Sequence, residues 1–519
     1  MKFLGALRHY LQRPLGPDDC RHRIVSHLRD RDAATLRLFQ HVYAEEGGPY
    51  RRLLRHAGIA YEDVVELVGR EGVEGALGQL HTSGVHLTLD EFKGRRPIRR
   101  GSLEIPTDAH DFDNRALAPH FVTRTGGSRS AGRELLVDVE LLAHEACYES
   151  HTLAQFGLTE RPRAIWRPVP PGTAGIKGML RYAKAGYPMA RWFSQSPPWS
   201  RDEWRHSLFT AATMLTSRAA GRPLAWPEYV PIAQAGTVAS WLVGAKSGGV
   251  PGLLETNVAS AVRVCRAADA QGLDISGSFF RVGGEPYTAA RAGVIEAAGC
   301  RAASHYSMSE VGRIANPCAD PAAPDDAHVA TDKVAVLARD VKPSGADVSV
   351  PGLFLTTVHP STPKIMINVE LGDYATLSTR PCRCIWHQLG LTLRLQNIRS
   401  YEKLTAEGMH FVGADLLTLV EETLPAAFGG SPTDYQIVES DEAGVPAVTV
   451  IVSPGVGACD ESRLKETVVA QLGAGGASAR MMASRWREAG TLRVVRREPY
   501  TTAAGKVLAL HVPQGKARQ

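Results

Sequence analysis

Four short segments of the chain combine glycine, hydroxyl and charged residues in patterns that can bind a nucleotide. The first is the stretch FVTRTGGSRSAGRE at 121–134, where an apolar strand runs into a loop of Thr, Gly and Ser with two arginines. Glycine allows close approach, so that backbone N–H groups and hydroxyls can bind phosphate oxygens. The loop matches neither G-x-x-x-x-G-K-[ST] nor G-x-G-x-x-G, and a flexible surface turn stays an alternative interpretation.

The second segment is the Gly-Gly-Glu-Pro turn at 283–286, which follows an apolar strand and precedes the sequence SHYSMSE at 304–310. An aromatic side chain at a strand end can stack on adenine. A carboxylate shortly after it can hold Mg²⁺ beside ATP phosphates. Taken alone, this segment is better explained by a turn and a capped helix start than by a nucleotide site.

The third and fourth segments are shorter. Asp373, in a Gly-Asp-Tyr sequence after the apolar run IMINVEL, can accept hydrogen bonds from both ribose hydroxyls, although an Asp in a turn is common. The sequence TTAAGK near the C-terminus ends in Gly505 and Lys506. A solvated loop is the alternative there.

The elements that must position these segments can be read from the sequence. Residues 1–100 are predicted to be mainly helical, because apolar residues recur at helical spacing in PYRRLLRHAGIAYEDVVELVGREG. From about 120 short β-rich runs alternate with helices, which is typical of an α/β domain. After about 400 two helical patterns and two strand patterns form a compact α+β module. We therefore expect a domain boundary near 398–403.

Composition limits the classes of protein that the chain can represent. Its 519 residues exceed one ordinary core, so two or more domains are expected. A net charge of +5 gives no strong reason to expect nucleic acid binding. Apolar runs fall short of a membrane span, and the N-terminus reads as an amphipathic helix and not a signal peptide. A cytoplasmic location without a disulfide framework is the expectation.

Three cysteines and one histidine have the side chains of a zinc site. Cys318 is followed by His328, and Cys382 and Cys384 lie farther along the chain. Closed structural zinc sites use four such ligands. The alternative is a set of unrelated surface thiols and an ordinary polar histidine.

In their order, these segments resemble the adenylate-forming superfamily of acyl- and aryl-CoA synthetases, peptide-synthetase adenylation domains and luciferases. The corresponding motifs here are TRTGGSRSAG, GGEP, YSMSE, GDY, IRSYEK and TTAAGK. The nearest branch is similar to phenylacetate-CoA ligase, through PYRRLLRHAGI, GGEPYTAARAGVIEAAGC and the Cys after YSMSE. The resemblance covers nearly the whole chain.

The resemblance implies an α/β fold: a large N-terminal adenylate-forming domain with mixed sheets and helices, and a small mobile α+β C-terminal domain. The domains would be 1–398, with a helical region at 1–100, and 399–519. It implies an AMP-forming acid–thiol ligase that uses ATP and Mg²⁺. A carboxylic acid, aryl or aryl-acetic by similarity, would become an acyl-adenylate and pass to CoA or to a phosphopantetheine carrier protein.

The resemblance also implies roles for individual residues. Catalysis would fall to Ser309 at the α-phosphate, Glu310 at Mg²⁺ and Lys506 at the α-phosphate and carboxylate oxygens. ATP would be bound by Thr125, Gly126, Gly127, Ser128, Gly284, Glu285, Pro286, Tyr306, Asp373 and Arg399. The branch often carries cysteines and a histidine matching Cys318, His328, Cys382 and Cys384, which implies structural Zn²⁺.

Some positions depart from the family pattern. Arg129 replaces a Gly of the phosphate loop, Ser307 replaces a Gly before the Met-Ser-Glu sequence, and Tyr401 stands where the hinge Asp is usual. These departures bear on the second half-reaction more than on ATP binding. They leave open an amine or other small nucleophile as acceptor, and also an ATP- or acyl-binding module without turnover. A homodimer also stays open.

Overall fold

The computed structural model describes residues 2–117, 121–124, 134–199, 204–341, 349–400, 403–406, 409–412, 419–430, 434–442, 445–473, 477–490, 492–500 and 510–511. The predicted phosphate-loop residues Thr125, Gly126, Gly127 and Ser128, and the predicted catalytic Lys506, lie outside these ranges.

Helices dominate the first hundred residues, as the apolar spacing predicts. They are α1 (Lys2–Gln12), α2 (Pro17–Arg29), α3 (Arg31–Ala44), α4 (Pro49–His56), α5 (Tyr61–Thr82) and α6 (Leu89–Phe92). The helical spacing after residue 49 falls on two helices, because the chain turns between α4 and α5 at Gly58 with φ of 70°. A small hairpin of β1 (Ile98–Arg100) and β2 (Leu103–Ile105) follows.

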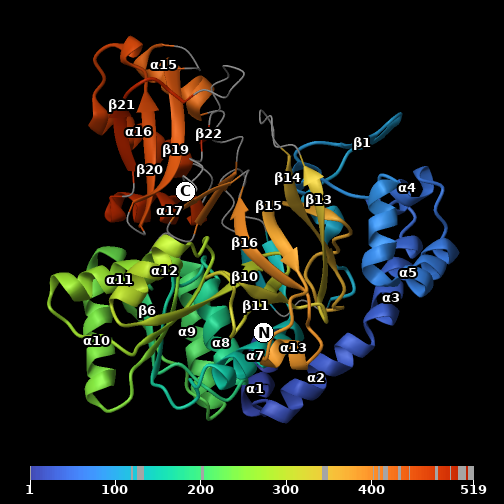
Figure 1. Cartoon of the computed structure of the whole chain (residues 1–519), viewed down its shortest axis with the longest axis horizontal. Helices are drawn as coiled ribbons and strands as arrows, with labels where there is room; N and C mark the ends of the chain where they lie inside the picture. The colour runs from blue at the N-terminus through green and yellow to red at the C-terminus, as the bar shows by residue number, and fades with distance from the viewer. Residues whose placement is uncertain are drawn as a thin grey trace.

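A twelve-stranded sheet forms the centre of the large N-terminal part (Figure 1), in the order β13-β14-β15-β16-β12-β11-β10-β9-β8-β5-β6-β7. Its parallel half consists of β5 (Arg163–Trp166), β6 (Arg191–Ser194), β7 (Pro227–Tyr229), β8 (Leu253–Thr256), β9 (Phe279–Gly283) and β10 (Arg301–Met308). Its antiparallel half consists of β11 (Gly312–Pro317), β12 (Ala327–Val329), β13 (Val334–Val341), β14 (Val350–Thr357), β15 (Val369–Ser378) and β16 (Arg394–Ser400).

Helices cover both faces of the parallel half, which explains why its central strands are buried along their length. Ile165 packs toward the cluster that contains α1 and α8, while its neighbour Trp166 packs toward the cluster of α10 and α11. The helices are α7 (Val139–Gln155), α8 (Ala174–Lys184), α9 (Trp204–Ala219), α10 (Ala235–Ser247), α11 (Val258–Ala270) and α12 (Ala289–Ala297). Strands β3 (Phe121–Arg124) and β4 (Glu134–Val137) form a separate hairpin before α7.

The C-terminal part has its own sheet and its own core (Figure 1). A hairpin of β17 (Lys403–Ala406) and β18 (Met409–Val412) comes first. A four-stranded sheet follows, in the order β21-β20-β19-β22, with β19 (Tyr435–Glu442), β20 (Val445–Val452), β21 (Leu492–Arg496) and β22 (Leu510–His511). The helices are α15 (Leu424–Phe428), α16 (Glu461–Gly473) and α17 (Ala477–Ala489), after a π-helical turn at Leu419–Thr423.

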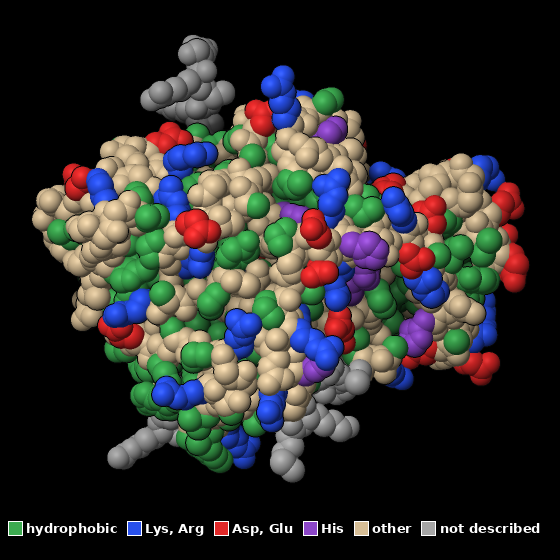
Figure 2. Space-filling view, turned by 90° about the horizontal axis from the view of Figure 1, so that it is seen from below, with side chains coloured by type: hydrophobic (Ala, Val, Ile, Leu, Met, Phe, Trp, Pro, Cys, Tyr) green, Lys and Arg blue, Asp and Glu red, His purple; other side chains and the backbone are tan. Residues whose placement is uncertain are grey.

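The surface of the protein carries charges of both signs. Figure 2 shows basic and acidic side chains interspersed on the face in view, in keeping with the net charge of +5. Among the described residues, no helix combines the length and apolar character that a membrane crossing requires.

A buried ionic cluster ties helix α7 to both halves of the large sheet. Glu149 of α7 is bonded to Arg281 of β9, with 3.0 Å between Oε2 and Nη2, and its other oxygen is bonded to Arg313 of β11. One turn earlier on α7, Glu145 is bonded to Lys333 at 2.8 Å. Burial alone would raise the pKa of Glu149, but Arg313 and Arg281 lower it to about 2. The cluster therefore fixes the two halves of the sheet against one helix.

We expect Glu149→Gln to lower the free energy of unfolding by about 3–5 kcal/mol, because it leaves buried guanidinium groups without their counter-charge. Folding lowers the pKa of Glu149 from its usual 4.5, so its contribution is present above pH 4.5 and is lost as the pH falls toward 2. Urea unfolding at pH 7 checks this. The matched control is Glu66→Gln, which breaks an exposed ion pair with Arg70 and should cost less than about 1 kcal/mol. Equal losses would contradict the prediction.

Candidate functional site

The predicted adenine-binding turn lies at the carboxyl end of β9, an edge where ligands bind in parallel sheets. Gly284 adopts a φ of 85°, which favours glycine, and Glu285 behind it is buried. The carbonyl oxygen of Pro286 accepts a hydrogen bond of 2.6 Å from Arg291 of α12. The Gly-Gly-Glu-Pro segment thus forms a turn between β9 and α12, and the hydrogen bond from Arg291 stabilises it.

Tyr306 and Asp373 meet although 67 residues separate them. The Tyr306 hydroxyl donates a hydrogen bond of 2.6 Å to Oδ2 of Asp373. Their strands, β10 and β15, are separated in the sheet by β11, β12 and β16. A flat sheet would hold strands four places apart at about 19 Å, at ~4.8 Å per step, which is farther than these two side chains can reach. The sheet must therefore bend here, and the bend brings the two predicted ATP contacts together.

Arg399 lies on the strand that pairs with the strand of Asp373. It is on β16, directly opposite Tyr374 of β15, and Asp373 pairs with the following residue. Its Nη1 donates hydrogen bonds to Oδ2 of Asp325 at 2.9 Å and to the carbonyl oxygen of Ile398 at 2.7 Å. The predicted ribose carboxylate and the predicted hinge cation thus occupy neighbouring strands.

Glu310 and Ser309 occupy the turn between β10 and β11. Ser309 is exposed, whereas Glu310 is buried and forms an ion pair with Lys93, the residue that follows α6. A buried carboxylate requires a counter-charge, and Lys93 supplies it. Lys93 is not among the site residues that the sequence predicts. The only signal was its place in the basic run FKGRRPIRR, which predicts a solvated surface as readily as a site.

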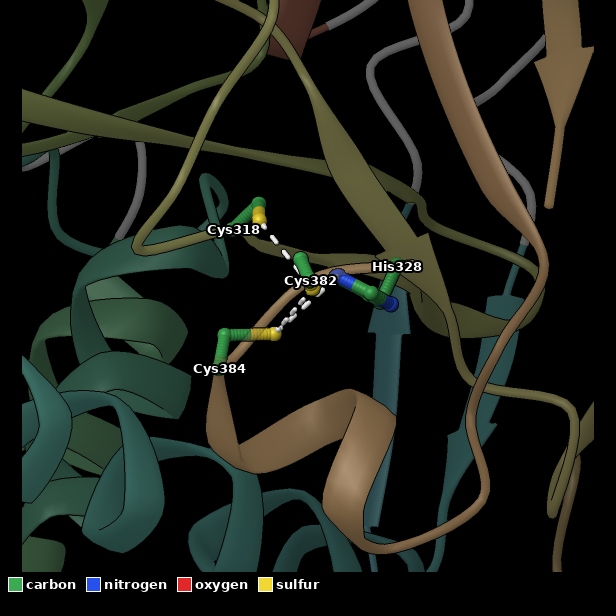
Figure 3. Close-up of side chains that lie close together, drawn as sticks. All are labelled: Cys318, His328, Cys382 and Cys384. Atoms are coloured by element: carbon green, nitrogen blue, oxygen red, sulfur yellow. Dashed lines mark hydrogen bonds between the residues drawn. The ribbon is translucent and has the colours of Figure 1, made fainter. Parts of the chain in front are cut away.

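Three cysteines and one histidine converge at the end of β11 (Figure 3). The Sγ atoms of Cys318 and Cys382 are 3.8 Å apart, and those of Cys382 and Cys384 are 3.1 Å apart. The Nε2 atom of His328 lies 3.3 Å from Cys382 Sγ and 3.1 Å from Cys384 Sγ. Zn–S bonds of ~2.3 Å in a tetrahedral site place sulfur atoms about 3.8 Å apart, so the cluster has the size of a zinc site.

The protonation of these side chains also suits a metal. Nδ1 of His328 lies 2.6 Å from the carbonyl oxygen of Leu391, which can only accept a hydrogen bond, so Nδ1 carries the proton. That leaves the lone pair of Nε2 directed at the sulfur atoms, the arrangement common in metal sites. The contact between Cys318 and Cys384 lowers the pKa of the Cys384 thiol and raises that of Cys318, so Cys384 is the thiol of this pair that more readily becomes the metal-binding thiolate. The donor set therefore fits zinc.

A second group of side chains, His27, His144 and His359, is equally close together but has a different protonation pattern. His144 Nε2 is bonded to Asp332 Oδ2 at 2.7 Å. Nδ1 of His359 accepts a hydrogen bond of 3.1 Å from the backbone N–H of Ser361. The neutral ring of His359 therefore carries its proton on Nε2, where it cannot bind a metal. The two clusters are similar in their distances but differ in protonation, and only the cysteine and histidine cluster has its donor atoms free to bind a metal.

No protein-family model matches the sequence, and no curated protein matches it. The chain is similar to a solved structure of 2-hydroxyisobutyryl-CoA ligase in complex with 2-HIB-AMP and CoA, with a TM-score of 0.53 and 15% identity. That match covers 93% of this chain and 90% of the ligase chain. An amide bond synthetase from Marinactinospora thermotolerans matches at a TM-score of 0.41 and 13% identity, over 97% and 98% of the chains.

The likeness to the CoA ligase extends over both parts of the chain, and it confirms the mixed α/β fold class expected from the sequence. The protein therefore has the fold of this CoA ligase.

Proposed function

We propose that the protein activates a carboxylic acid with ATP to give an acyl-adenylate and pyrophosphate. The observation that carries the proposal is the contact between Tyr306 and Asp373, with Arg399 on the neighbouring strand. Three sequence motifs, each weak alone, supply these residues, and they meet within a fold shared with a CoA ligase. If these motifs were unrelated turns and surface residues, we would not expect Tyr306 to contact Asp373 beside the strand of Arg399.

In the proposed site, each described residue has a role that its position supports. Tyr306 stacks on adenine beside the turn at Gly284, Glu285 and Pro286, while Asp373 accepts hydrogen bonds from the ribose hydroxyls. Arg399 offers further N–H groups to ribose or phosphate, and the exposed Ser309 contacts the α-phosphate. Thr125, Gly126, Gly127 and Ser128, outside the described residues, would bind the β- and γ-phosphates.

Glu310 is the residue that would hold Mg²⁺, which would neutralise phosphate charge when bound. The ion pair with Lys93 supports this role, because the same buried carboxylate already attracts a cation. Lys93 would then lie beside the triphosphate and add positive charge there. The phosphate loop lacks the usual Lys-Pro, having Ser130 and Ala131 instead, so a lysine from another segment is chemically apt.

The proposed reaction has two steps, adenylation and thiolysis. A carboxylate oxygen of the substrate attacks the α-phosphorus, the bond to the β-phosphate breaks, and pyrophosphate leaves. A thiolate then attacks the acyl carbon, forming a C–S bond and releasing AMP. The protein contributes positioning and charge neutralisation in both steps.

We propose CoA as the acceptor thiol, with a carrier protein's phosphopantetheine or a small amine as alternatives. The solved CoA ligase with the same fold supports this choice. The acid is proposed to be aryl or aryl-acetic, on the resemblance to phenylacetate-CoA ligase. Between the steps the C-terminal domain, residues 399–519, would rotate about a hinge at 399–403 and withdraw Lys506.

The function is tested with a panel of aryl and alkyl acids, measured by pyrophosphate release with and without CoA. Activity with at least one acid is expected.

Asp373→Asn should raise the KM for ATP by about 10–100-fold, since hydrogen bonds to a charged group contribute about 1.5–3 kcal/mol. The KM for the acid should change little. ATP binding without pyrophosphate release for any acid would instead favour a non-catalytic module.

Lys506→Ala is expected to slow adenylation by on the order of 10²-fold or more, because the cation stabilises charge that develops only in the transition state. Thiolysis of a supplied acyl-adenylate should largely survive. Single-turnover assays of each half-reaction measure the two effects, with Lys465→Ala, a half-buried lysine of α16, as control. An equal loss in both half-reactions would exclude the domain rotation.

We also propose that Cys318, His328, Cys382 and Cys384 hold a structural Zn²⁺ ion, as their spacing and protonation support. Purified protein should contain about one equivalent of zinc, and Cys384→Ser should remove most of it. Cys459→Ser, which changes a thiol in the C-terminal domain, should leave the zinc content unchanged. Less than about a tenth of an equivalent after preparation without chelators would refute the site.

A further inference from the structure

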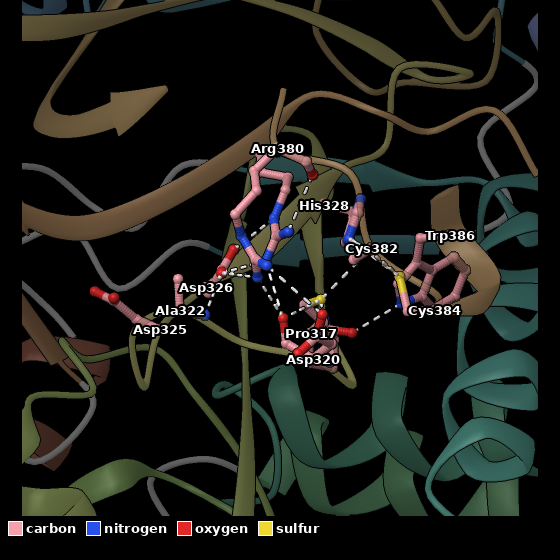
Figure 4. A network of polar contacts seen from close by, with 12 residues as sticks. Pro317, Asp320, Ala322, Asp325, Asp326, His328, Arg380, Cys382, Cys384 and Trp386 are labelled. Atoms are coloured by element: carbon pink, nitrogen blue, oxygen red, sulfur yellow. Dashed lines mark hydrogen bonds and ion pairs between the residues drawn. The ribbon is translucent and has the colours of Figure 1, made fainter. Parts of the chain in front are cut away.

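The loop between Cys318 and His328 joins two members of the metal-ligand cluster and carries two buried aspartates. Asp325 and Asp326 have side chains only 4% and 2% exposed. Asp325 points away from the cluster, whereas Asp326 faces the arginines beside it (Figure 4), and both carboxylates bond to strand β16, which leads to Arg399. The two ends of the loop therefore belong to the cluster, and its aspartates bond to strand β16.

Asp325 makes three hydrogen bonds to consecutive residues of β16. Its carboxylate accepts from the backbone N–H groups of Asn397 and Ile398 and from Nη1 of Arg399, each at 2.9 Å. Asn397 has a φ of 57°, in the left-handed region that non-glycine residues seldom adopt. The two N–H bonds stabilise this backbone turn, and the turn sets the direction in which Arg399 leaves the strand.

Asp326 and Asp320 hold the other end of the same strand. Asp326 pairs with the buried Arg394 at the start of β16, with 3.0 Å between Oδ1 and Nε. The carbonyl oxygen of Asp320 accepts hydrogen bonds from Arg380 at 2.7 Å and from Arg394 at 3.2 Å. Every contact comes from the short loop that the cluster closes. If the loop moves, both ends of β16 lose partners.

We propose that this loop is the positioning element of Arg399, with Asp325 as the positioning residue and the metal cluster as its anchor. Metal binding fixes the loop ends, the loop fixes Asp325, and Asp325 fixes both the turn at Asn397 and one nitrogen of the guanidinium group. In the part of the chain that the structure describes, Nε and Nη2 of Arg399 make no hydrogen bond. They are held ready for an anionic ligand. The role of Arg399 toward ATP rests on the proposed function; the coupling of cluster to strand does not.

The coupling can be measured without any substrate by hydrogen exchange in peptides that cover 394–400. Removal of metal from the wild-type protein by a chelator should raise exchange at Asn397 and Ile398 about 10-fold or more, because hydrogen bonds to a carboxylate contribute about 1.5–3 kcal/mol. Peptides that cover β9, in the parallel half of the sheet, should not change. If exchange at 394–400 is insensitive to metal removal, the anchoring role is excluded.

Asp325→Asn separates the aspartate from the metal. The variant should keep its zinc, show the same faster exchange at 394–400, and raise the KM for ATP about 10-fold with a smaller change in kcat. Asp320→Asn is the matched control, since its exposed carboxylate lies 3.6 Å from the exposed Arg380 and makes no contact with β16. It should behave as the wild type.

A double-mutant cycle with Arg399→Ala tests whether Asp325 acts through that arginine. The effects of Asp325→Asn and Arg399→Ala on the KM for ATP should be non-additive, because one removes the target of the other. Additive effects would overturn the positioning role. If exchange responds as expected but no acid supports pyrophosphate release, the coupling stands and the proposed function fails.

Discussion

The fold depends on the neutralisation of two carboxylates buried under the large sheet. Glu145 and Glu149 lie one turn apart on α7, and their cationic partners come from β9, from β11 and from the segment before β13. An unpaired charge in such a place would be prohibitive, so the parallel and antiparallel halves must approach α7 together. This requirement sets the relative position of the two halves. The bend that brings Tyr306 to Asp373 lies between those same halves.

The residues of the proposed site come from both halves of the sheet. The parallel half supplies the turn at Gly284 and the aromatic ring of Tyr306, whereas the antiparallel half supplies Asp373 and Arg399. Neither half alone holds all the residues of the proposed nucleotide site. Glu310 stands at the turn where the chain passes from one half to the other, and a lysine from the N-terminal helical region meets it there. A nucleotide bound here would therefore contact three regions that are remote in sequence.

The sequence predicted the strongly periodic elements and the residues with chemical character. The strand before Gly283, the helix after it and helix α16 were visible in the spacing of apolar residues. The four metal-ligand candidates were named from residue type and resemblance, and the structure brings them together. Lys93 and Asp325 could not be predicted, because a charged side chain in a polar loop looks the same whether it faces solvent or a buried partner. Their roles follow from tertiary contacts across 217 and 74 residues.

The cysteine and histidine cluster also has a consequence for how the chain reaches its native state. Its first and last members, Cys318 and Cys384, are 66 positions apart in the sequence, and the strands β13, β14 and β15 lie between them. An ion that joined the ligands before these strands pair would have to offset the entropy cost of closing the whole intervening loop, so we expect it to bind after the strands have paired. Metal would act late, converting a reversible docking of strands into a cross-linked one, and its effect would be seen mainly in the rate at which this part of the chain unfolds.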